Sequence, residues 1–195
     1  MDILTVCTGN ICRSPLAALI LRTRLADLGV TVRSAGVRGL ASAEMTPEAV
    51  HLAVEYGVSA EDAASHRSRF LTEPMLAEPD LILTMTLEHR RDVAELAPSR
   101  LRSTFTAREF GRLAASLTDE EITASIAAST TAEDSSAARL RAAAAIVAAQ
   151  RGLVPPADDD VVDPYRRSWE VYRTSADQLL PALEQVERVV RLVAR

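Results

Sequence analysis

The chain has 195 residues, of which 48% are hydrophobic and 25% charged, so it is long enough for one folded domain and too apolar for a disordered protein. Its 22 basic residues are all arginine and stand against 27 acidic residues, and the resulting net charge of −5 gives no reason to expect a nucleic-acid partner. The longest apolar run, residues 142–149, is far shorter than the roughly 20 residues that cross a bilayer, and the chain starts with an early acid instead of the basic segment of a secretory signal. We therefore expect a cytoplasmic protein without membrane insertion.

Short apolar runs predict four strands. They lie at residues 3–6, 30–34, 81–83 and 101–105. Helical patterns separate these runs, and such close alternation of strands and helices is typical of parallel βαβ units. We predict an α/β fold with three layers, α/β/α, around a four-stranded parallel sheet.

Three helices are predicted between the strands. They cover residues 14–28, 46–56 and 86–96. The first takes Ser14 as its N-cap and Gly29 as its C-terminal cap, because these residue types favour those positions. Thr106 and Glu109 have the spacing of a capping box and predict the start of a further helix.

The alternation stops after Arg112. Residues 113–157, here called the central segment, are rich in Ala, Ser and Thr and carry helix formers between residues 137 and 150. We predict that the central segment is an inserted helical element in a single domain of residues 1–195, with a flexible linker as the alternative. A last amphipathic helix is predicted over residues 168–192, with an inner face of Trp169, Tyr172, Ala176, Leu179, Leu183, Val186 and Val190.

The segment after the first strand contains a cysteine and an arginine separated by five residues, Cys7 and Arg13. This spacing alone is weak evidence for an anion-binding loop, because arginine is frequent in the chain and the spacing can arise by chance. Its position adds weight, since ligands bind at the carboxyl ends of parallel strands and helix N-termini attract anions. The five residues between them, Thr8, Gly9, Asn10, Ile11 and Cys12, can curl into a ring of inward-pointing amides that Arg13 closes with a bidentate guanidinium.

The same positive surroundings favour the thiolate form of a cysteine, which is the nucleophilic form. The sequence therefore predicts a phosphate-binding loop between the first strand and the first helix, with Cys7 as the nucleophile. The alternative is a buried structural cysteine beside a surface arginine. Two cysteines and three scattered histidines do not supply the spaced ligands of a zinc site, so we expect neither a metal nor a cofactor.

A cysteine that attacks a phosphate monoester needs a proton donor for the leaving oxygen. An acidic loop just before the last helix, residues 158–165, offers Asp163 as a candidate. In general an Asp-Pro pair such as Asp163-Pro164 is more often a turn with a solvated carboxylate.

Five blocks together closely resemble the low-molecular-weight protein tyrosine phosphatases and occur in that family's order. They are the loop at residues 6–15, Ser34-Ala35-Gly36, His66-Arg67-Ser68-Arg69, residues 80–85 and Asp163-Pro164-Tyr165. The resemblance covers residues 1–112 and 158–195 and leaves the central segment outside it.

The resemblance implies a role for each matched residue. Cys7 would form a phosphocysteine intermediate, Arg13 would clamp the phosphate, and Asp163 would act as general acid and later as base. Residues that would shape the loop or wall the substrate slot are Asn10, Ile11, Ser14, Ser34, Leu40, His66 and Tyr165.

Three other functions are alternatives to a tyrosine phosphatase. Protein arginine phosphatases carry Thr where this chain has Ile11, and a branched apolar residue suits an aromatic ring better than a guanidinium. Thioredoxin-coupled arsenate reductases need further cysteines, and none follows Cys12. A non-catalytic phosphotyrosine-binding module would not need Cys7, Arg13 and Asp163 together. We therefore predict a protein tyrosine phosphatase, with arginine phosphatase and binding module as alternatives.

The resemblance also suggests partners and regulation. The expected substrate is a tyrosine-phosphorylated protein, with a bacterial tyrosine autokinase as one candidate. The family often has a second aromatic residue where this chain has Arg166, which puts regulation through paired tyrosines in doubt. Cys12 is either a small packing residue or a redox partner that forms a reversible disulfide with Cys7.

Overall fold

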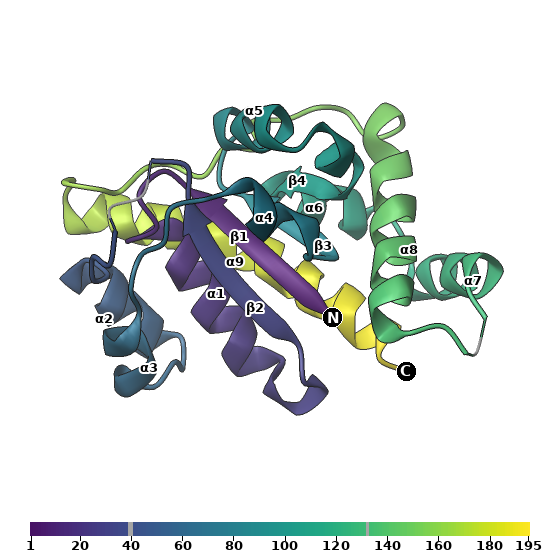
Figure 1. Ribbon diagram of the computed structural model, residues 1–195, viewed down its shortest axis with the longest axis horizontal. Helices are drawn as coiled ribbons and strands as arrows, with labels where there is room; N and C mark the ends of the chain where they lie inside the picture. Colours follow the sequence, from purple (N-terminus) through teal and green to yellow (C-terminus); the bar gives the residue numbers. More distant parts are fainter. Residues whose placement is uncertain (39–40, 132) are drawn as a thin grey trace.

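The computed structural model describes residues 1–38, 41–131 and 133–195. Its centre is a four-stranded sheet with the order β2-β1-β3-β4, in which every pair of neighbours is parallel (Figure 1). The strands are β1 (Asp2–Cys7), β2 (Thr31–Gly36), β3 (Leu81–Thr84) and β4 (Thr104–Thr106). The predicted parallel α/β sheet is thus confirmed.

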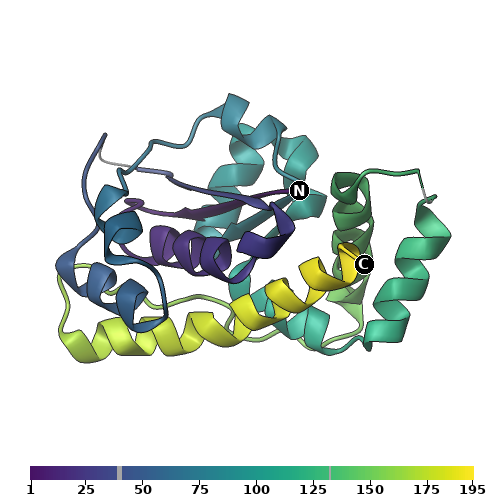
Figure 2. The same cartoon turned by 90° about the horizontal axis from the view of Figure 1, so that it is seen from below.

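Helices cover both faces of the sheet, as the two perpendicular views show (Figures 1 and 2). Helices α1 (Arg13–Arg24) and α9 (Trp169–Val193) lie on one face, and α4 (Glu73–Ala77) and α5 (Leu87–Leu96) lie on the other. Side chains of β1 alternate accordingly: Ile3 belongs to the large core under α1 and α9, whereas Leu4 belongs to the smaller core on the opposite face.

The other helices surround this centre. They are α2 (Pro47–Glu55), α3 (Ala60–Ser65), α6 (Ala107–Ala115), α7 (Asp119–Ser129) and α8 (Ser136–Ala149), with short 3₁₀ helices at Ala26–Leu28, Pro98–Ser103 and Gln150–Gly152. None of the helices in the described part of the chain is long and apolar enough to span a membrane.

Several predicted boundaries were wrong. Helix α1 begins at Arg13, not at Ser14, and Ser14 does not cap it, because its hydroxyl instead faces the sulfur of Cys7. The same helix ends at Arg24, and Gly29, with a φ of 61°, caps the 3₁₀ helix that follows. The fourth strand is short, because most of the run predicted for it forms the 3₁₀ helix Pro98–Ser103.

Two side-chain predictions were also wrong. Thr106 caps α6 through the amide of Glu109, but the Glu109 carboxylate does not complete the capping box, since it binds Arg151. Trp169 does not lie on the inner face of α9, because it is 37% exposed and stacks edge-on against His51. The remaining residues predicted for that inner face are buried.

The central segment forms the end of α6 and helices α7 and α8, which pack against α9, and α8 also packs against β3 and the 3₁₀ helix Pro98–Ser103 (Figure 1). Its apolar side chains join the large core, and those that are fully or nearly fully buried include Ile122, Ile126, Leu140 and Val147. Arg141 of α8 also pairs with the buried carboxylate of Asp80 at 2.5 Å. These contacts tie the central segment to the sheet domain.

Candidate active site

The loop at residues 8–12 lies where β1 ends and α1 begins, at the carboxyl edge of the sheet. It packs against Gly36, which pairs with Cys7 in the adjacent strand. A Cβ atom at position 36 would lie 2.6 Å from the Thr8 carbonyl oxygen and 2.9 Å from the Asn10 nitrogen. Only glycine therefore lets the loop approach β2 this closely. The sequence block around Gly36 was noted, but this steric role was not.

Cys7 is buried at the base of the loop. Its sulfur accepts a hydrogen bond from the Asn10 amide at 3.2 Å and lies 2.9 Å from the Ser14 hydroxyl. The Asn10 side-chain amide donates to the same Ser14 oxygen at 3.0 Å, which orients that hydroxyl. Two donor groups therefore face the sulfur, an arrangement that suits a thiolate nucleophile.

Asn10 holds the loop in shape. Its φ of 55° is left-handed, a conformation that asparagine tolerates better than most residues. Its side-chain oxygen accepts from the Arg69 amide at 2.9 Å, and its carbonyl lies 2.8 Å from Nε2 of His66. Burial and the nearby arginines lower the pKa of His66, so the ring is neutral at pH 7 and must donate from Nε2.

Ser34 lies apart from this network. It is buried on β2, and within the described residues its hydroxyl makes no hydrogen bond to the loop. It lines a separate cavity together with His66.

Arg13 projects from the first turn of α1 into the loop and is only 4% exposed. Its Nη1 donates to the Val161 carbonyl at 3.0 Å, and its Nη2 lies 3.0 Å from a carboxylate oxygen of Asp163. Asp163 is half exposed at the opposite side of the site. The structure thus brings the predicted clamp and the predicted acid together from opposite ends of the chain.

A cavity of about 260 Å³ opens above the sulfur. It is lined by Cys7, Thr8, Gly9, Ile11, Cys12, Arg13, Arg38, Asp163 and Tyr165. Ile11 and the 41% exposed Tyr165 supply apolar surface, and Arg38 adds a positive charge. Leu40, the third predicted wall residue, lies outside the described residues.

Sequence reasoning missed a histidine beside the loop. Nε2 of His89 lies 2.8 Å from the Thr8 hydroxyl, and its Nδ1 lies 2.9 Å from the Thr86 hydroxyl. The Thr8 oxygen also accepts from Arg13 at 3.4 Å, so the hydroxyl joins the guanidinium to the imidazole. Burial and the charge of Arg13 lower the pKa of His89 to about 4, so the ring is neutral at pH 7 and has one donor and one acceptor nitrogen.

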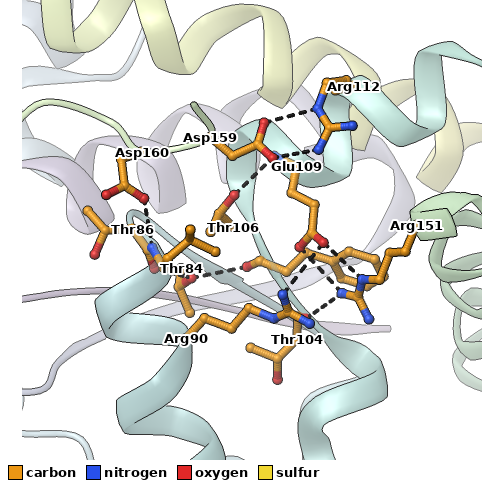
Figure 3. Close-up of polar contacts among 12 residues, drawn as sticks. Thr84, Thr86, Arg90, Thr104, Thr106, Glu109, Arg112, Arg151, Asp159 and Asp160 are labelled. Atoms are coloured by element: carbon orange, nitrogen blue, oxygen red, sulfur yellow. Dashed lines mark hydrogen bonds and ion pairs between the residues drawn. The ribbon is translucent and has the colours of Figure 1, made fainter. Parts of the chain in front are cut away.

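The loop that carries Asp163 is tied to the domain by several polar contacts (Figure 3). Arg112 of α6 binds Asp159 through two hydrogen bonds of 3.1 and 2.6 Å, and the Asp160 carboxylate accepts from the Leu87 amide at the start of α5. The Val161 amide donates to the Met85 carbonyl at 2.8 Å. Asp159 and Asp160 therefore position the loop and leave Asp163 as the acid that faces Arg13.

Behind this loop, Glu109 joins α6 to the central segment (Figure 3). Its carboxylate accepts from Arg151 at 2.9 Å and lies 3.6 Å from Arg90 of α5. Arg151 also lies over the ring of Phe105, 4.2 Å from its centroid.

Cys12 is buried under the loop as a free thiol. Its sulfur contacts the hydroxyls of Thr46 at 3.5 Å and Tyr172 at 3.6 Å, and burial raises its pKa. No cluster of three or more potential metal ligands occurs among the residues that the structure describes.

Comparison with known proteins agrees with this geometry. The family model described as "Low molecular weight phosphotyrosine protein phosphatase" matches residues 2–117. Etp of Escherichia coli K12, a low molecular weight protein-tyrosine-phosphatase, is 48% identical over 97 residues, which are 50% of this chain and 62% of Etp. The chain thus spans less than two thirds of the length of that relative.

Two further matches extend the comparison. The protein-arginine-phosphatase of Bacillus subtilis strain 168 is 38% identical over 112 residues, 56% of this chain and 72% of that protein. The crystal structure of the low molecular weight protein tyrosine phosphatase from T. tengcongensis superposes with a TM-score of 0.65 at 28% identity, covering 95% of this chain and 97% of that one. The chain belongs to the low molecular weight phosphotyrosine protein phosphatase family.

Proposed function

We propose that this protein is a protein tyrosine phosphatase that hydrolyses phosphotyrosine through a phosphocysteine intermediate. The observation that carries the proposal is the convergence of Cys7, Arg13 and Asp163 on one cavity with an apolar wall. Family membership and the tyrosine-phosphatase name of Etp support the same activity.

In the first step the Cys7 sulfur attacks phosphorus, and the bond from phosphorus to the tyrosine oxygen breaks. Arg13 and the loop amides bind the three non-bridging oxygens, where negative charge is concentrated. Phosphate bound to Arg13 competes with Asp163 for the guanidinium, which releases the Asp163 carboxyl toward the leaving oxygen. Protonated Asp163 then gives its proton to that oxygen, so that tyrosine leaves as a neutral phenol.

In the second step a water molecule attacks the phosphocysteine. Asp163, now a carboxylate, takes a proton from this water, and the phosphorus–sulfur bond breaks with the electron pair returning to Cys7. The Ser14 hydroxyl, 2.9 Å from the sulfur, stabilises the departing thiolate. Inorganic phosphate is the second product, and the enzyme regains its starting state.

Ile11 favours a phosphorylated tyrosine over a phosphorylated arginine. Its side chain is apolar and lies in the wall of the cavity with Tyr165, which suits an aromatic ring and offers no hydroxyl to a guanidinium. This point matters because an arginine phosphatase is among the similar proteins.

The test compares kcat/KM for matched phosphotyrosine and phosphoarginine peptides, in the parent protein and in Ile11→Thr. We expect the parent to prefer the phosphotyrosine peptide by at least tenfold and Ile11→Thr to narrow that preference. A parent protein that prefers the phosphoarginine peptide would overturn the substrate assignment. Binding of the phosphotyrosine peptide without release of phosphate would instead indicate a non-catalytic binding module.

The physiological substrate is proposed to be a tyrosine-phosphorylated protein in the cytoplasm, with a tyrosine autokinase as the first candidate to test. The central segment is proposed to be an insertion in a single phosphatase domain. The burial of its side chains within the large core supports a single domain. The family match, which stops at residue 117, supports an insertion.

A further inference from the structure

A second cavity lies between α1, β2 and the segment that follows α3. Its volume is about 310 Å³, and it is lined by Arg22, Arg33, Ser34, Ser65, His66, Arg67 and Arg69. We call it the arginine cavity. It shares no lining residue with the cavity above Cys7.

Two of its four arginines have no acidic partner. Arg33 pairs with Asp2 and Glu78, and Arg67 pairs with Glu44. In contrast, neither Arg22 nor Arg69 forms an ion pair with any residue that the structure describes.

Arg22 and Arg69 are close enough to repel each other. Burial, followed by the charge of Arg69, lowers the pKa of Arg22, and Asp62 offsets this only in part. Like charges gathered in a partly enclosed cavity create a positive potential that attracts anions.

The walls can also donate hydrogen bonds. Planar guanidinium groups match the geometry of phosphate oxygens and bind them in pairs. Ser34 also lines the cavity, and within the described residues its hydroxyl has no hydrogen-bond partner. A volume larger than that of the active-site cavity, with arginines on several sides, suits a chain of phosphate groups more than a single one.

We propose that the arginine cavity is a second anion site, which binds a polyphosphate group such as inorganic triphosphate or the triphosphate of a nucleotide. Arg22 and Arg69 would make the principal contacts, because they alone among the four arginines have no acidic partner in the described structure.

The site is connected to the phosphate-binding loop through Asn10. His66 reaches the Asn10 carbonyl at 2.8 Å, and the Arg69 backbone amide donates to the Asn10 side chain at 2.9 Å. The groups that face His66 from neighbouring elements are Arg22 on α1 and Arg67 and Arg69 on its own segment, and their charges contribute to its lowered pKa. A bound polyanion offsets these charges, so it raises the pKa of His66 and favours the imidazolium, a stronger donor to Asn10.

The experiment measures calorimetric binding of inorganic triphosphate at about 0.15 M salt, where loose surface attraction is screened. The protein carries Cys7→Ser to prevent turnover, and saturating benzylphosphonate fills the active-site cavity. We expect one equivalent of triphosphate to bind. Arg22→Gln and Arg69→Gln should each weaken binding about tenfold or more, the effect of losing a charged hydrogen bond.

Arg24→Gln is the matched control, since Arg24 lies on the same helix, pairs with Glu187 and does not line the arginine cavity. Arg69 is exposed, so its variant should fold even if Arg22→Gln does not. NMR titration of the His66 ring should show its pKa rising when triphosphate binds. Equal affinity for inorganic triphosphate and ATP would assign recognition to the phosphates alone, and tighter ATP binding would show that the nucleoside also contributes.

Two results would overturn the proposal. One is loss of all triphosphate binding when benzylphosphonate is present, which would place the ligand in the active site. The other is unchanged affinity in both Arg22→Gln and Arg69→Gln, with no response of His66, which would show only an adventitious surface ion.

Discussion

Thr8 connects Arg13 to a histidine that is 81 positions away from Thr8 in sequence. Its hydroxyl accepts from Arg13 and forms a hydrogen bond with Nε2 of His89, whose Nδ1 forms another with the Thr86 hydroxyl. Because His89 is neutral at pH 7, one of its ring nitrogens donates in this chain of hydrogen bonds and the other accepts. Protonation would make both ring nitrogens donors and place a second positive charge beside Arg13.

Stability should therefore depend on pH through His89. Its pKa is about 4 in the folded protein, against an ordinary value near 6.5, so the unfolded chain takes up the proton first as the pH falls. We expect a loss of about 2–3 kcal/mol of unfolding free energy between pH 6.5 and pH 4 from this group. Urea denaturation of the parent and of His89→Gln across this range checks the effect.

The slope with pH should be smaller in His89→Gln than in the parent. His51→Gln is the matched control, because His51 is an exposed residue against Trp169 and does not line the cavity above Cys7. Identical slopes in the parent and in His89→Gln would show that His89 is not held neutral by the fold.

We expect Cys12 to determine whether peroxide inactivation is reversible. The Cys7 sulfenic acid would condense with the Cys12 thiol to give a disulfide and water, which protects Cys7 from further oxidation. Because burial raises the pKa of Cys12, this step should be slow at neutral pH and faster above it. We expect dithiothreitol to restore activity after a brief peroxide pulse in the parent but much less in Cys12→Ser. Full recovery of the Cys12→Ser protein would make Cys12 a packing residue only.

At the level of elements, the acid loop is positioned by α5 and α6. Asp159 is largely buried and bound by Arg112, and the Asp160 carboxylate accepts from the Leu87 amide at the start of α5. Removing Arg112 leaves a nearly buried carboxylate without its partner, which loosens the loop that carries Asp163.

Arg112→Ala should therefore lower the rate with poor leaving groups, as Asp163→Asn should, but by a smaller factor. General acid catalysis is typically worth about 10²–10⁴ in rate, and we expect Arg112→Ala to lose about tenfold, mainly with poor leaving groups. The measurement is kcat for a series of aryl phosphates with phenols of increasing pKa, with Arg24→Ala as the control at an unrelated ion pair. A loss that is equal for good and poor leaving groups would mean that Arg112 does not position the acid.

Local signals account for the elements that the sequence predicted well. The apolar runs in β1 and β3 and the helices predicted over residues 46–56 and 86–96 depend on neighbouring residues only, and the structure confirms them. Helices α3 and α4 were missed because each is at most six residues long and too short for an apolar period. Ser14 was misjudged because its contact with Cys7 outweighs its preference for a cap.

In the candidate site too, features marked by local sequence could be predicted and features that depend on distant contacts could not. Cys7 and Arg13 are close in sequence, so their shared loop could be predicted from spacing and position. Asp163 became a strong candidate only through family resemblance. His89 and the Arg112–Asp159 pair depend on contacts between distant segments, and no local pattern marks them.

In the whole molecule, the central segment should unfold together with the sheet domain. Leu140 of α8 is fully buried in the large core, and Arg151 joins the same region through Glu109. Leu140→Ala should therefore destabilise the entire protein by about 2–5 kcal/mol in one cooperative transition, as seen by calorimetry. A separate transition at lower temperature, with the main one unchanged, would show that the central segment folds independently.

Direct detection of the covalent intermediate tests the proposed chemistry most sharply. Asp163→Ala protein is mixed with a phosphotyrosine peptide, quenched in acid within milliseconds to seconds, digested and sequenced by tandem mass spectrometry. The fragments distinguish Cys7 from Cys12, and we predict a transient phosphate on Cys7 that is absent in Cys7→Ser and decays as inorganic phosphate appears. Turnover by the parent with no phosphate on Cys7 at any time, or turnover that survives Cys7→Ser, would contradict the phosphocysteine mechanism.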